Sequence, residues 1–273
     1  MSKTIFITGA SKGFGRIWTN ALLERGDKVV ATSRTIHAYD DLVKKYPDTF
    51  LPLTLDITHK QAVNEALAQA KAHFGSLDVV INNAGYGLFG AVEELEEADA
   101  RAILDTNVLG TLFVTQAALP ILRAQGHGHI IQLSSVLGVW SLPILGMYNA
   151  SKFAVEGLSE ALAHEVKGFG IHVTLVEPNG YKTEFGGGSA VRSNPIAAYD
   201  GVREQLFRTE GMPAEEYGNP EATIPALLQL IDAQNPPLRL FLGNLGLRKT
   251  KEEFAGKIAE WELWNDVAVA AHG

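Results

Sequence analysis

The sequence predicts an α/β fold in which helices cover both faces of a doubly wound parallel sheet of about seven strands. Short runs of β-branched and aliphatic residues alternate with longer segments of helical periodicity along the chain. Glycine-rich or amide-rich turns follow several of the apolar runs directly. No internal repeat, low-complexity run or linker divides the chain, so we expect a single domain over residues 1–273.

Each expected strand is a short apolar run that leads into a polar or glycine-containing turn. The expected strands are 4–8, 28–33, 49–55, 77–81, 129–133, 171–176 and 238–242. The expected helices are 16–25, 59–74, 95–125, 148–168, 220–233 and an amphipathic C-terminal helix at 250–267. Strands that alternate with helices in this way pair in parallel, because each helix returns the chain to the same edge of the sheet.

Composition excludes several kinds of protein. The net charge of −8 and a pI near 5.5 argue against nucleic acid or an anionic membrane as a main partner. The chain has no cysteine, so it has no disulfide, thiol nucleophile or thiolate metal site, and we expect no bound metal. The first strand begins by Thr4, and no apolar run approaches ~18 residues. We therefore expect a soluble cytoplasmic protein without a membrane-spanning helix.

A glycine-rich turn links the first strand to the first helix. Residues 8–15 read T-G-A-S-K-G-F-G, with glycines at 9, 13 and 15. Gly9 permits the tight turn, Gly13 lets the backbone approach a pyrophosphate, and Gly15 lets the helix pack closely. The pattern could instead be a merely tight turn, but its position between a strand and a helix favours a phosphate site.

The end of the second strand bears on the choice of dinucleotide. A site for NAD usually has an acidic residue there, which binds the ribose 2′-hydroxyl. Here the strand ends in Thr32, Ser33 and Arg34, without an acid. Arg34 and Lys12 could flank a 2′-phosphate instead, although both could also be ordinary solvated surface charges.

Two further turns at strand ends are suited to a ligand. Asp56 follows the third strand, and N-N-A-G at 82–85 follows the fourth. A small glycine turn at the end of a strand allows close approach of a ligand. Asp78, near the start of the fourth strand and before its run of apolar residues, is interpreted as structural. Asn107 lies among apolar residues of the expected 95–125 helix. Its amide could be a core group whose hydrogen bonds are satisfied, or it could be a link in a proton relay.

The segment from Ser134 to Lys152 contains the strongest catalytic candidates. Ser134 and Ser135 end the fifth strand, where open α/β sheets bind ligands. Tyr148 and Lys152 are four residues apart and therefore share one face of a helix. A nearby ammonium favours the phenolate, so such a tyrosine can exchange a proton near neutral pH. Taken alone, this pair could also be an ordinary surface or interface pair.

These motifs together closely resemble the short-chain dehydrogenase/reductase family, and its single-domain ketoreductase branch in particular. The glycine motif, N-N-A-G, Asn107, Ser135 and Y-x-x-x-K at 148–152 occur in family order and spacing over roughly residues 3–245. The resemblance implies a Rossmann-type fold and an NADP(H)-dependent oxidoreductase that acts on a small-molecule ketone or alcohol.

The resemblance also implies a role for each motif residue. Tyr148 would be the general acid in reduction, and Lys152 would hold the nicotinamide ribose and lower the pKa of Tyr148. Ser135, thirteen residues before Tyr148, would orient the carbonyl, and Asn107 would hold a water that connects Lys152 to solvent. The residues expected to contact the cofactor are Gly9, Ser11, Lys12, Gly13, Phe14, Gly15, Ser33, Arg34, Asp56, Ile57, Asn83, Ala84, Gly85, Tyr148, Lys152, Pro178, Asn179, Gly180, Tyr181 and Thr183.

One departure from the family pattern concerns the substrate pocket. The family usually has Pro-Gly after the sixth strand, and here the pair is Pro178-Asn179. We expect the Asn179 amide to lie near the nicotinamide and the substrate. The residues expected to line the substrate pocket are Val136, Leu137, Trp140, Leu145, Asn179 and Phe185, together with a mobile lid at about 185–218.

Two other functions remain open from sequence. One is an NAD-linked hydroxysteroid or polyol dehydrogenase, and the other is a protein that senses NADP(H) without turnover. Families of this kind often pair through the helices that here span 95–125 and 148–168. A homodimer or homotetramer is therefore expected, and the C-terminal helix, which carries Trp261 and Trp264, could favour one over the other.

Overall fold

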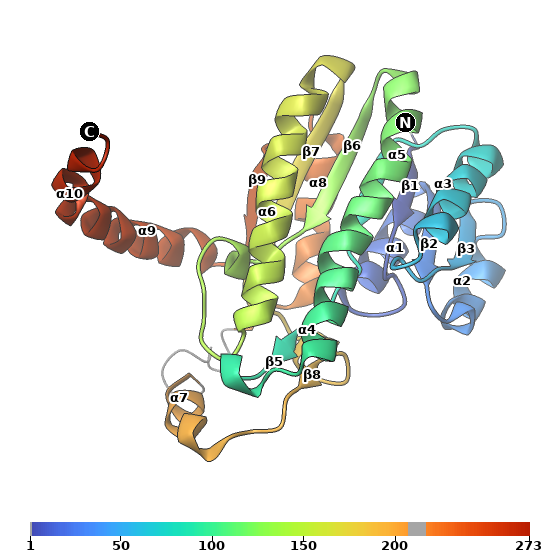
Figure 1. Cartoon of the computed structure of the whole chain (residues 1–273). Coiled ribbons are helices and arrows are strands. Elements are labelled where there is room, and N and C mark those ends of the chain that lie inside the picture. The colour runs from blue at the N-terminus through green and yellow to red at the C-terminus, as the bar shows by residue number, and fades with distance from the viewer. Residues whose placement is uncertain (1, 207–216) are drawn as a thin grey trace.

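The computed structural model describes residues 2–206 and 217–273 and contains the expected parallel sheet (Figure 1). Seven strands lie in the order β3-β2-β1-β4-β6-β7-β9, and each neighbouring pair is parallel. The strands are β1 (Thr4–Ile7), β2 (Lys28–Ser33), β3 (Phe50–Thr54), β4 (Val79–Asn82), β6 (Gly128–Leu133), β7 (Ile171–Pro178) and β9 (Arg239–Leu242). All seven expected strands are confirmed, with ends that differ by at most two residues from the expected ones.

The direction in which the chain travels across the sheet reverses between β1 and β4. From β1 the chain moves outward to β2 and β3, and it then crosses back to β4 on the other side of β1. The loops that follow β1 and β4 therefore leave the carboxyl edge of the sheet in opposite directions. The crevice between such loops is where open α/β sheets bind ligands.

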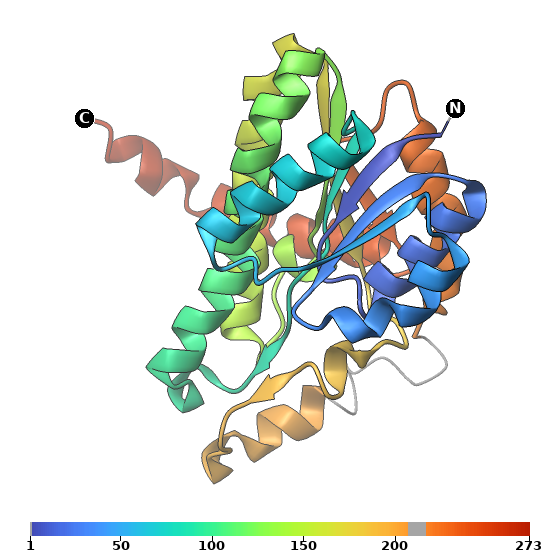
Figure 2. The same ribbon diagram turned by 90° about the vertical axis from the view of Figure 1, so that its right-hand side faces the viewer.

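Helices cover both faces of the sheet, and the two helical layers are separated in Figure 2. One face carries α1 (Gly13–Arg25), α2 (Asp40–Lys45) and α8 (Ile224–Asp232), and the other carries α3 (Lys60–Phe74), α5 (Thr111–Gln125) and α6 (Gly146–Val166).

Successive side chains of β1 point to opposite faces of the sheet and so pack against the two helical layers in turn. Ile5 and Ile7 pack in the cluster that contains Trp18 of α1, whereas Phe6 packs in the opposite cluster with Leu67 of α3. Because β1 is buried on both faces, three consecutive residues, Ile5, Phe6 and Ile7, are apolar rather than alternately polar and apolar.

The long helix expected at 95–125 is interrupted. The structure has α4 (Glu97–Leu104), a π-helical segment at Asp105–Gly110 and then α5. By length and composition, the continuous run Glu97–Gln125 could cross a membrane, contrary to the sequence-based expectation. This is weak evidence, because α5 packs against α3, β4 and β6 as a core helix of the sheet layer does.

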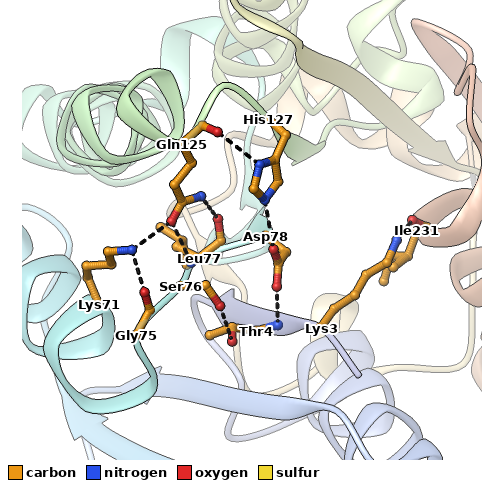
Figure 3. Close-up of polar contacts among 10 residues, drawn as sticks. All are labelled: Lys3, Thr4, Lys71, Gly75, Ser76, Leu77, Asp78, Gln125, His127 and Ile231. Carbon is orange, nitrogen blue, oxygen red and sulfur yellow. Dashed lines mark hydrogen bonds and ion pairs between the residues drawn. The ribbon is translucent and has the colours of Figure 1, made fainter. Parts of the chain in front are cut away.

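Asp78 has a structural role, as expected, at the amino edge of the sheet (Figure 3). Its carboxylate accepts a hydrogen bond from the backbone N–H of Thr4 at 2.7 Å, and it lies 3.2 Å from Nε2 of His127. Nearby, the Gln125 side chain pairs with the backbone of Leu77, accepting from its N–H and donating to its carbonyl. These contacts tie the start of β1 and β4 to the end of α5.

The described part of the expected lid is attached to the body by regular contacts. β8 (Val191–Arg192) pairs with β5 (Leu88–Phe89), and α7 (Asp200–Gln205) follows. The buried Glu94 carboxylate accepts from the Ile196 N–H at 2.7 Å and pairs with Arg203. Residues 207–216 of the expected lid, including Phe207, lie outside the described residues.

The C-terminal helix is longer than expected and projects from the body (Figure 1). It begins at Gly246, breaks at Trp264 and continues as α10, so that α9 spans Gly246–Leu263 and α10 spans Asn265–Ala270. Apart from Gly246, no residue of the two helices is buried.

Candidate active site

The glycine turn after β1 is shaped by contact with the turn after β4. A Cβ on Gly9, whose φ is +65°, would lie 2.7 Å from the Cα of Ala84. The Asn83 amide donates to the carbonyls of Thr8 and Gly9, at 2.8 and 3.0 Å, and a Cβ on Gly15 would strike that amide at 2.5 Å. The two turns are therefore in backbone contact at the point where the sheet predicts a ligand crevice.

The N-terminus of α1 is available to an anion. No side chain caps this helix, and its first turn contains no acidic residue. The space beside Gly13 is open, with only the Cβ of Thr183 near it at 3.9 Å. A hollow of about 490 Å³ adjoins the turn. The residues that line it are Lys12, Gly13, Arg16, Ile17, Lys182, Thr183, Glu184 and Pro220. Free N–H groups at a helix N-terminus bind phosphate groups well.

Two exposed cations lie near this turn. Lys12 is the N-cap residue of α1, and Arg34 follows the last residue of β2. Ser33 is buried and donates its hydroxyl hydrogen to the Thr35 carbonyl at 2.7 Å. Within residues 2–206 and 217–273, neither Lys12 nor Arg34 forms an ion pair. Both charges are thus available to a ligand at the ends of β1 and β2.

Tyr148 and Lys152 lie in the first two turns of α6 and are both buried. Lys152 Nζ lies 5.7 Å from the centre of the Tyr148 ring and donates to the Leu133 carbonyl of β6 at 2.7 Å. The four-residue spacing therefore brings the pair together against the end of a central strand.

Burial is the main influence on the pKa values of Tyr148 and Lys152. It raises the pKa of Tyr148 to about 12, an effect that the neighbouring Ser135 hydroxyl opposes. It lowers the pKa of Lys152 to about 8, an effect that Glu156 opposes. The pKa of Tyr148 therefore shifts in the direction opposite to the one expected from Lys152. Loss of water disfavours the charged phenolate.

Asn107 is connected to α6 through hydrogen bonds. It lies in the π-helical segment, and its amide exchanges hydrogen bonds with the N–H and carbonyl of Tyr86, at 3.1 and 3.0 Å. It also donates to Ser151 Oγ at 3.0 Å, and Ser151 donates to the Tyr148 carbonyl at 2.7 Å. A Cβ on Gly85 would lie 3.0 Å from Asn107 Oδ1 and 3.8 Å from Lys152 Nζ. Asn107, Gly85 and Lys152 therefore border one small space, and π-helical turns of this kind are frequent at functional sites.

Ser135 and the expected pocket residues gather around Tyr148. Ser135 caps the short helix Val136–Gly138 by accepting from the Leu137 N–H at 3.1 Å. The Phe185 ring lies 5.0 Å from that of Tyr148. The apolar cluster around Tyr148 includes Val136, Leu137, Trp140, Leu145 and Phe185. Within the described residues, the buried Nε1 of Trp140 in this cluster has no hydrogen-bond partner.

The Asn179 side chain lies against the turn after β9. Its N–H donates to the Leu242 carbonyl at 3.0 Å, and its side chain packs against Gly243. A Cβ on Gly243 would lie 1.4 Å from Asn179 Oδ1, so the amide occupies the space that a side chain at position 243 would fill. The Asn179 side chain therefore joins β7 to the turn after β9.

The remaining cofactor candidates lie at the glycine turn and at the ends of β3 and β7. Phe14 stacks on Trp18 and meets Tyr181 edge to face, each with ring centres 5.1 Å apart. Thr183 lies beside Gly13, as described above. Asp56 and Ile57 follow β3, where Asp56 accepts from Thr58, and Ile57 packs against Gly110 of the π-helical segment. Ser11 lies in the turn after β1, Pro178 ends β7, and Gly180 lies in the turn that follows β7.

Sequence reasoning overlooked Thr8, Arg16, Ser151 and Lys182. The Thr8 hydroxyl accepts from the N–H groups of Asn83 and Ala84, both at 3.0 Å. Arg16 bridges α1 to the Ala38 carbonyl and to Asp41. Arg16 directly follows the glycine motif, and this position in the sequence could have indicated that it lies near the expected phosphate site. Nothing local in sequence indicates Lys182.

A sequence model of the short chain dehydrogenase family matches residues 3–191, well over half of the chain. The chain belongs to this family. The family members it resembles include oxidoreductase BOA17 of Botryotinia fuckeliana, at 38% identity over 99% of this chain and 100% of the relative. A 3-ketodihydrosphingosine reductase of Bacteroides thetaiotaomicron is 36% identical over 88% of each chain.

Solved structures of other family members share the fold. A short-chain dehydrogenase from Streptomyces avermitilis aligns with a TM-score of 0.89 and 36% identity, over 99% of this chain and 98% of that one. ElxO with bound NADP aligns at 0.73 and 26%, over 89% and 96%. A 3-ketoacyl-(acyl-carrier-protein) reductase from Brucella melitensis with NADH aligns at 0.75 and 25%, over 88% and 96%. This dehydrogenase family member is therefore an oxidoreductase whose structural neighbours bind either nicotinamide dinucleotide.

The contact between the two glycine turns can be tested by stability. Gly9→Ala should lower the free energy of unfolding by about 1–2 kcal/mol for left-handed backbone and by about 1–3 kcal/mol more for the clash with Ala84. Gly26→Ala is the matched control, because Gly26 has a φ of +92° but no atom within 4 Å of its Cβ position. Equal losses for the two variants in urea unfolding would show that the turns are not in contact.

Proposed function

We propose that this dehydrogenase reduces small to medium, largely apolar ketones with NADPH and runs in reverse as a secondary-alcohol dehydrogenase. The arrangement that carries the proposal is the buried Tyr148 phenol, which lies between the Lys152 ammonium, the Ser135 hydroxyl and an apolar cluster. NADPH, when bound, supplies the hydride. The name of the Bacteroides relative, a reductase of a long-chain ketone, supports an apolar carbonyl substrate.

The residues of the chain supply binding and a proton. The uncapped N-terminus of α1 and the Gly9–Gly15 turn are suited to the pyrophosphate. Because its pKa is raised to about 12, Tyr148 is protonated at neutral pH, which is the form that a general acid for carbonyl reduction needs. Ser135 lies beside it and is placed to orient the carbonyl oxygen by donating its hydroxyl hydrogen. Lys152, with a pKa of about 8, still carries its charge at neutral pH.

Water must be kept from the carbonyl for this chemistry to be efficient. Phe185 covers the Tyr148 ring, and the segment that follows is attached through β8 and Glu94. We propose that the described part of this segment, residues 185–206, closes over the substrate. Since this part is fastened to β5 and Glu94, movement would be concentrated near the glycines at 186–188.

Replacing the Tyr148 hydroxyl tests the proton donor. Tyr148→Phe should retain the fold and NADPH affinity but lose at least ~100-fold in turnover, the low end for general acid catalysis. Tyr46→Phe is the control, because Tyr46 packs at the edge of the core beside α1. Near-full ketone reduction by Tyr148→Phe, followed by NADPH absorbance, would contradict the assignment.

The preference for NADPH rests on Arg34 and Lys12. A guanidinium can bind phosphate in a bidentate way, and a charge-assisted hydrogen bond contributes about 1.5–3 kcal/mol. Ser33→Asp combined with Arg34→Ala should therefore weaken NADPH binding by roughly 10- to 100-fold and shift preference toward NADH. Lys12→Ala should have a smaller effect. If the unmodified protein binds NADH as tightly as NADPH, the NAD-linked dehydrogenase is the better interpretation.

We also propose a homo-oligomer in which the C-terminal helices pack against another copy. Leu247, Phe254, Ile258, Trp261 and Trp264 are all at least 40% exposed along these helices. Residues 246–270 contain four basic and five acidic side chains, so this surface lacks the positive charge that favours an anionic membrane. Monomers rarely expose apolar surface of this extent, and burying one large apolar side chain contributes about 1.5–3 kcal/mol.

Substitution of the two tryptophans tests this surface. Trp261→Glu combined with Trp264→Glu should reduce the molar mass measured by light scattering without changing the helical content of the body. Glu260→Gln combined with Glu262→Gln changes charge on the same helix and should leave the mass unchanged. An unaltered mass in the tryptophan variant would show that these helices do not form the interface.

A further inference from the structure

A buried acidic cluster lies next to Lys152 and is not used by the proposed chemistry. Glu156 follows Lys152 by one turn of α6, and its side chain is 8% exposed. Glu177, near the end of β7, is fully buried. Arg239 of β9 lies 3.1 Å from Glu156, 3.5 Å from Glu177 and 3.0 Å from Glu160. We call these four residues the Arg239 cluster.

The cluster has too few donors for its acceptors. Arg239 Nε donates to Glu156 Oε2, and an arginine Nη donates to the half-exposed Glu160. No described residue donates to Glu156 Oε1 or to either oxygen of Glu177. A single proton on Glu177, donated to Glu156 Oε1, would satisfy one orphan oxygen on each residue. Burial and the neighbouring Glu156 carboxylate raise the pKa of Glu177 to about 8, which is consistent with a neutral acid.

The remaining charge of the cluster bears on Lys152. With Glu177 neutral, Arg239 is opposed by the carboxylates of Glu156 and Glu160, which leaves one net negative charge. Glu156 is the ionised group of the cluster that acts on Lys152, where it opposes the effect of burial. On α6 itself, Lys152 also meets Tyr148 as a titratable group. From the other elements it meets the uncharged Asn107 of the π-helical segment and the Leu133 carbonyl of β6.

We propose that Glu156 is a positioning residue for the reaction, and that Arg239 and the protonated Glu177 hold its carboxylate where it keeps the Lys152 ammonium charged. Only the kinetic consequence of this role for Glu156 rests on the proposed function. The effect of Glu156 on the Lys152 pKa does not. The arrangement joins three elements, α6, β7 and β9, at the carboxyl edge of the sheet. Ser134 and Gly138 pack beside Glu156. A Cβ on Gly138 would lie 2.7 Å from Ser134 Oγ and 3.0 Å from Glu156 Cγ.

The charge on Lys152 can be measured without any substrate. The full-length protein labelled with ¹³C at the lysine ε-carbons is titrated by NMR, and Lys152→Met identifies the Lys152 resonance. In Glu156→Gln the pKa of Lys152 should fall by about one unit, the lower end for loss of a close opposite charge. The basic limb of the pH profile of ketone reduction should move to lower pH by the same amount.

Glu160→Gln is the matched control, because Glu160 pairs with the same arginine but is half-exposed and two turns from Lys152. It should leave both the Lys152 pKa and the pH profile unchanged. An unchanged Lys152 pKa in Glu156→Gln, or equal shifts in the two variants, would overturn the proposal. Absence of ketone reduction by the unmodified protein would contradict the proposed function but leave the NMR result to decide the role of Glu156.

The proton on Glu177 has its own test in stability. A carboxyl whose pKa is raised on folding stabilises the folded state at low pH and loses this contribution as the pH rises through the folded-state pKa. Glu177→Gln, which resembles the neutral acid, should match the unmodified protein near pH 5 and melt higher by about 2 °C or more near pH 9. A lower melting temperature than the unmodified protein at both pH 5 and pH 9 would show that Glu177 is ionised throughout this range and stabilised by Arg239, and would overturn this part of the proposal.

Discussion

The burial of one ammonium group, that of Lys152, is the constraint on which the site depends. An unpaired charge inside a protein is costly unless it is hydrogen-bonded and opposed by another charge. Here Nζ donates to the Leu133 carbonyl, and the Glu156 carboxylate lies one helical turn away. The first of these contacts requires that α6 lie against the end of β6, and the second requires that β7 and β9 enclose Glu156. The position of a central helix is thus tied to three strands through polar groups as well as apolar packing.

The same burial explains why the pKa values of two neighbouring titratable groups shift in opposite directions. The pKa of Tyr148 is raised and that of Lys152 is lowered, since each group is displaced toward its uncharged form. At neutral pH the phenol keeps its proton and the ammonium, aided by Glu156, keeps its charge. This combination suits proton donation to a carbonyl oxygen more than proton abstraction from an alcohol, and so favours the reductive direction of the proposed reaction.

Much of this organisation was predictable from sequence, because it follows from local patterns. Apolar runs of strand length fixed all seven strands, and the four-residue spacing of Tyr148 and Lys152 placed both on one helical face. The π-helical segment around Asn107 was not predictable, since its residues fit an α-helix equally well. The direction of the Asn179 side chain depends on Gly243, which is 64 residues away in sequence. The role of Glu177 was hidden for the same reason, because its neighbours Glu156 and Arg239 come from other elements. The pKa of Tyr148 was misjudged because sequence shows the nearby cation but not the depth of burial.

We propose that this site transfers hydride to a carbonyl rather than merely binding a dinucleotide. The most direct measurement uses NADPH deuterated at the transferable C4 position, incubated with the protein and a panel of apolar ketones, with mass spectrometry of the alcohols formed. We expect one deuterium on the carbinol carbon of at least one product, at a rate that depends on the protein. Saturable binding of NADPH without deuterium in any product of the panel would contradict it and would favour a protein that senses the dinucleotide.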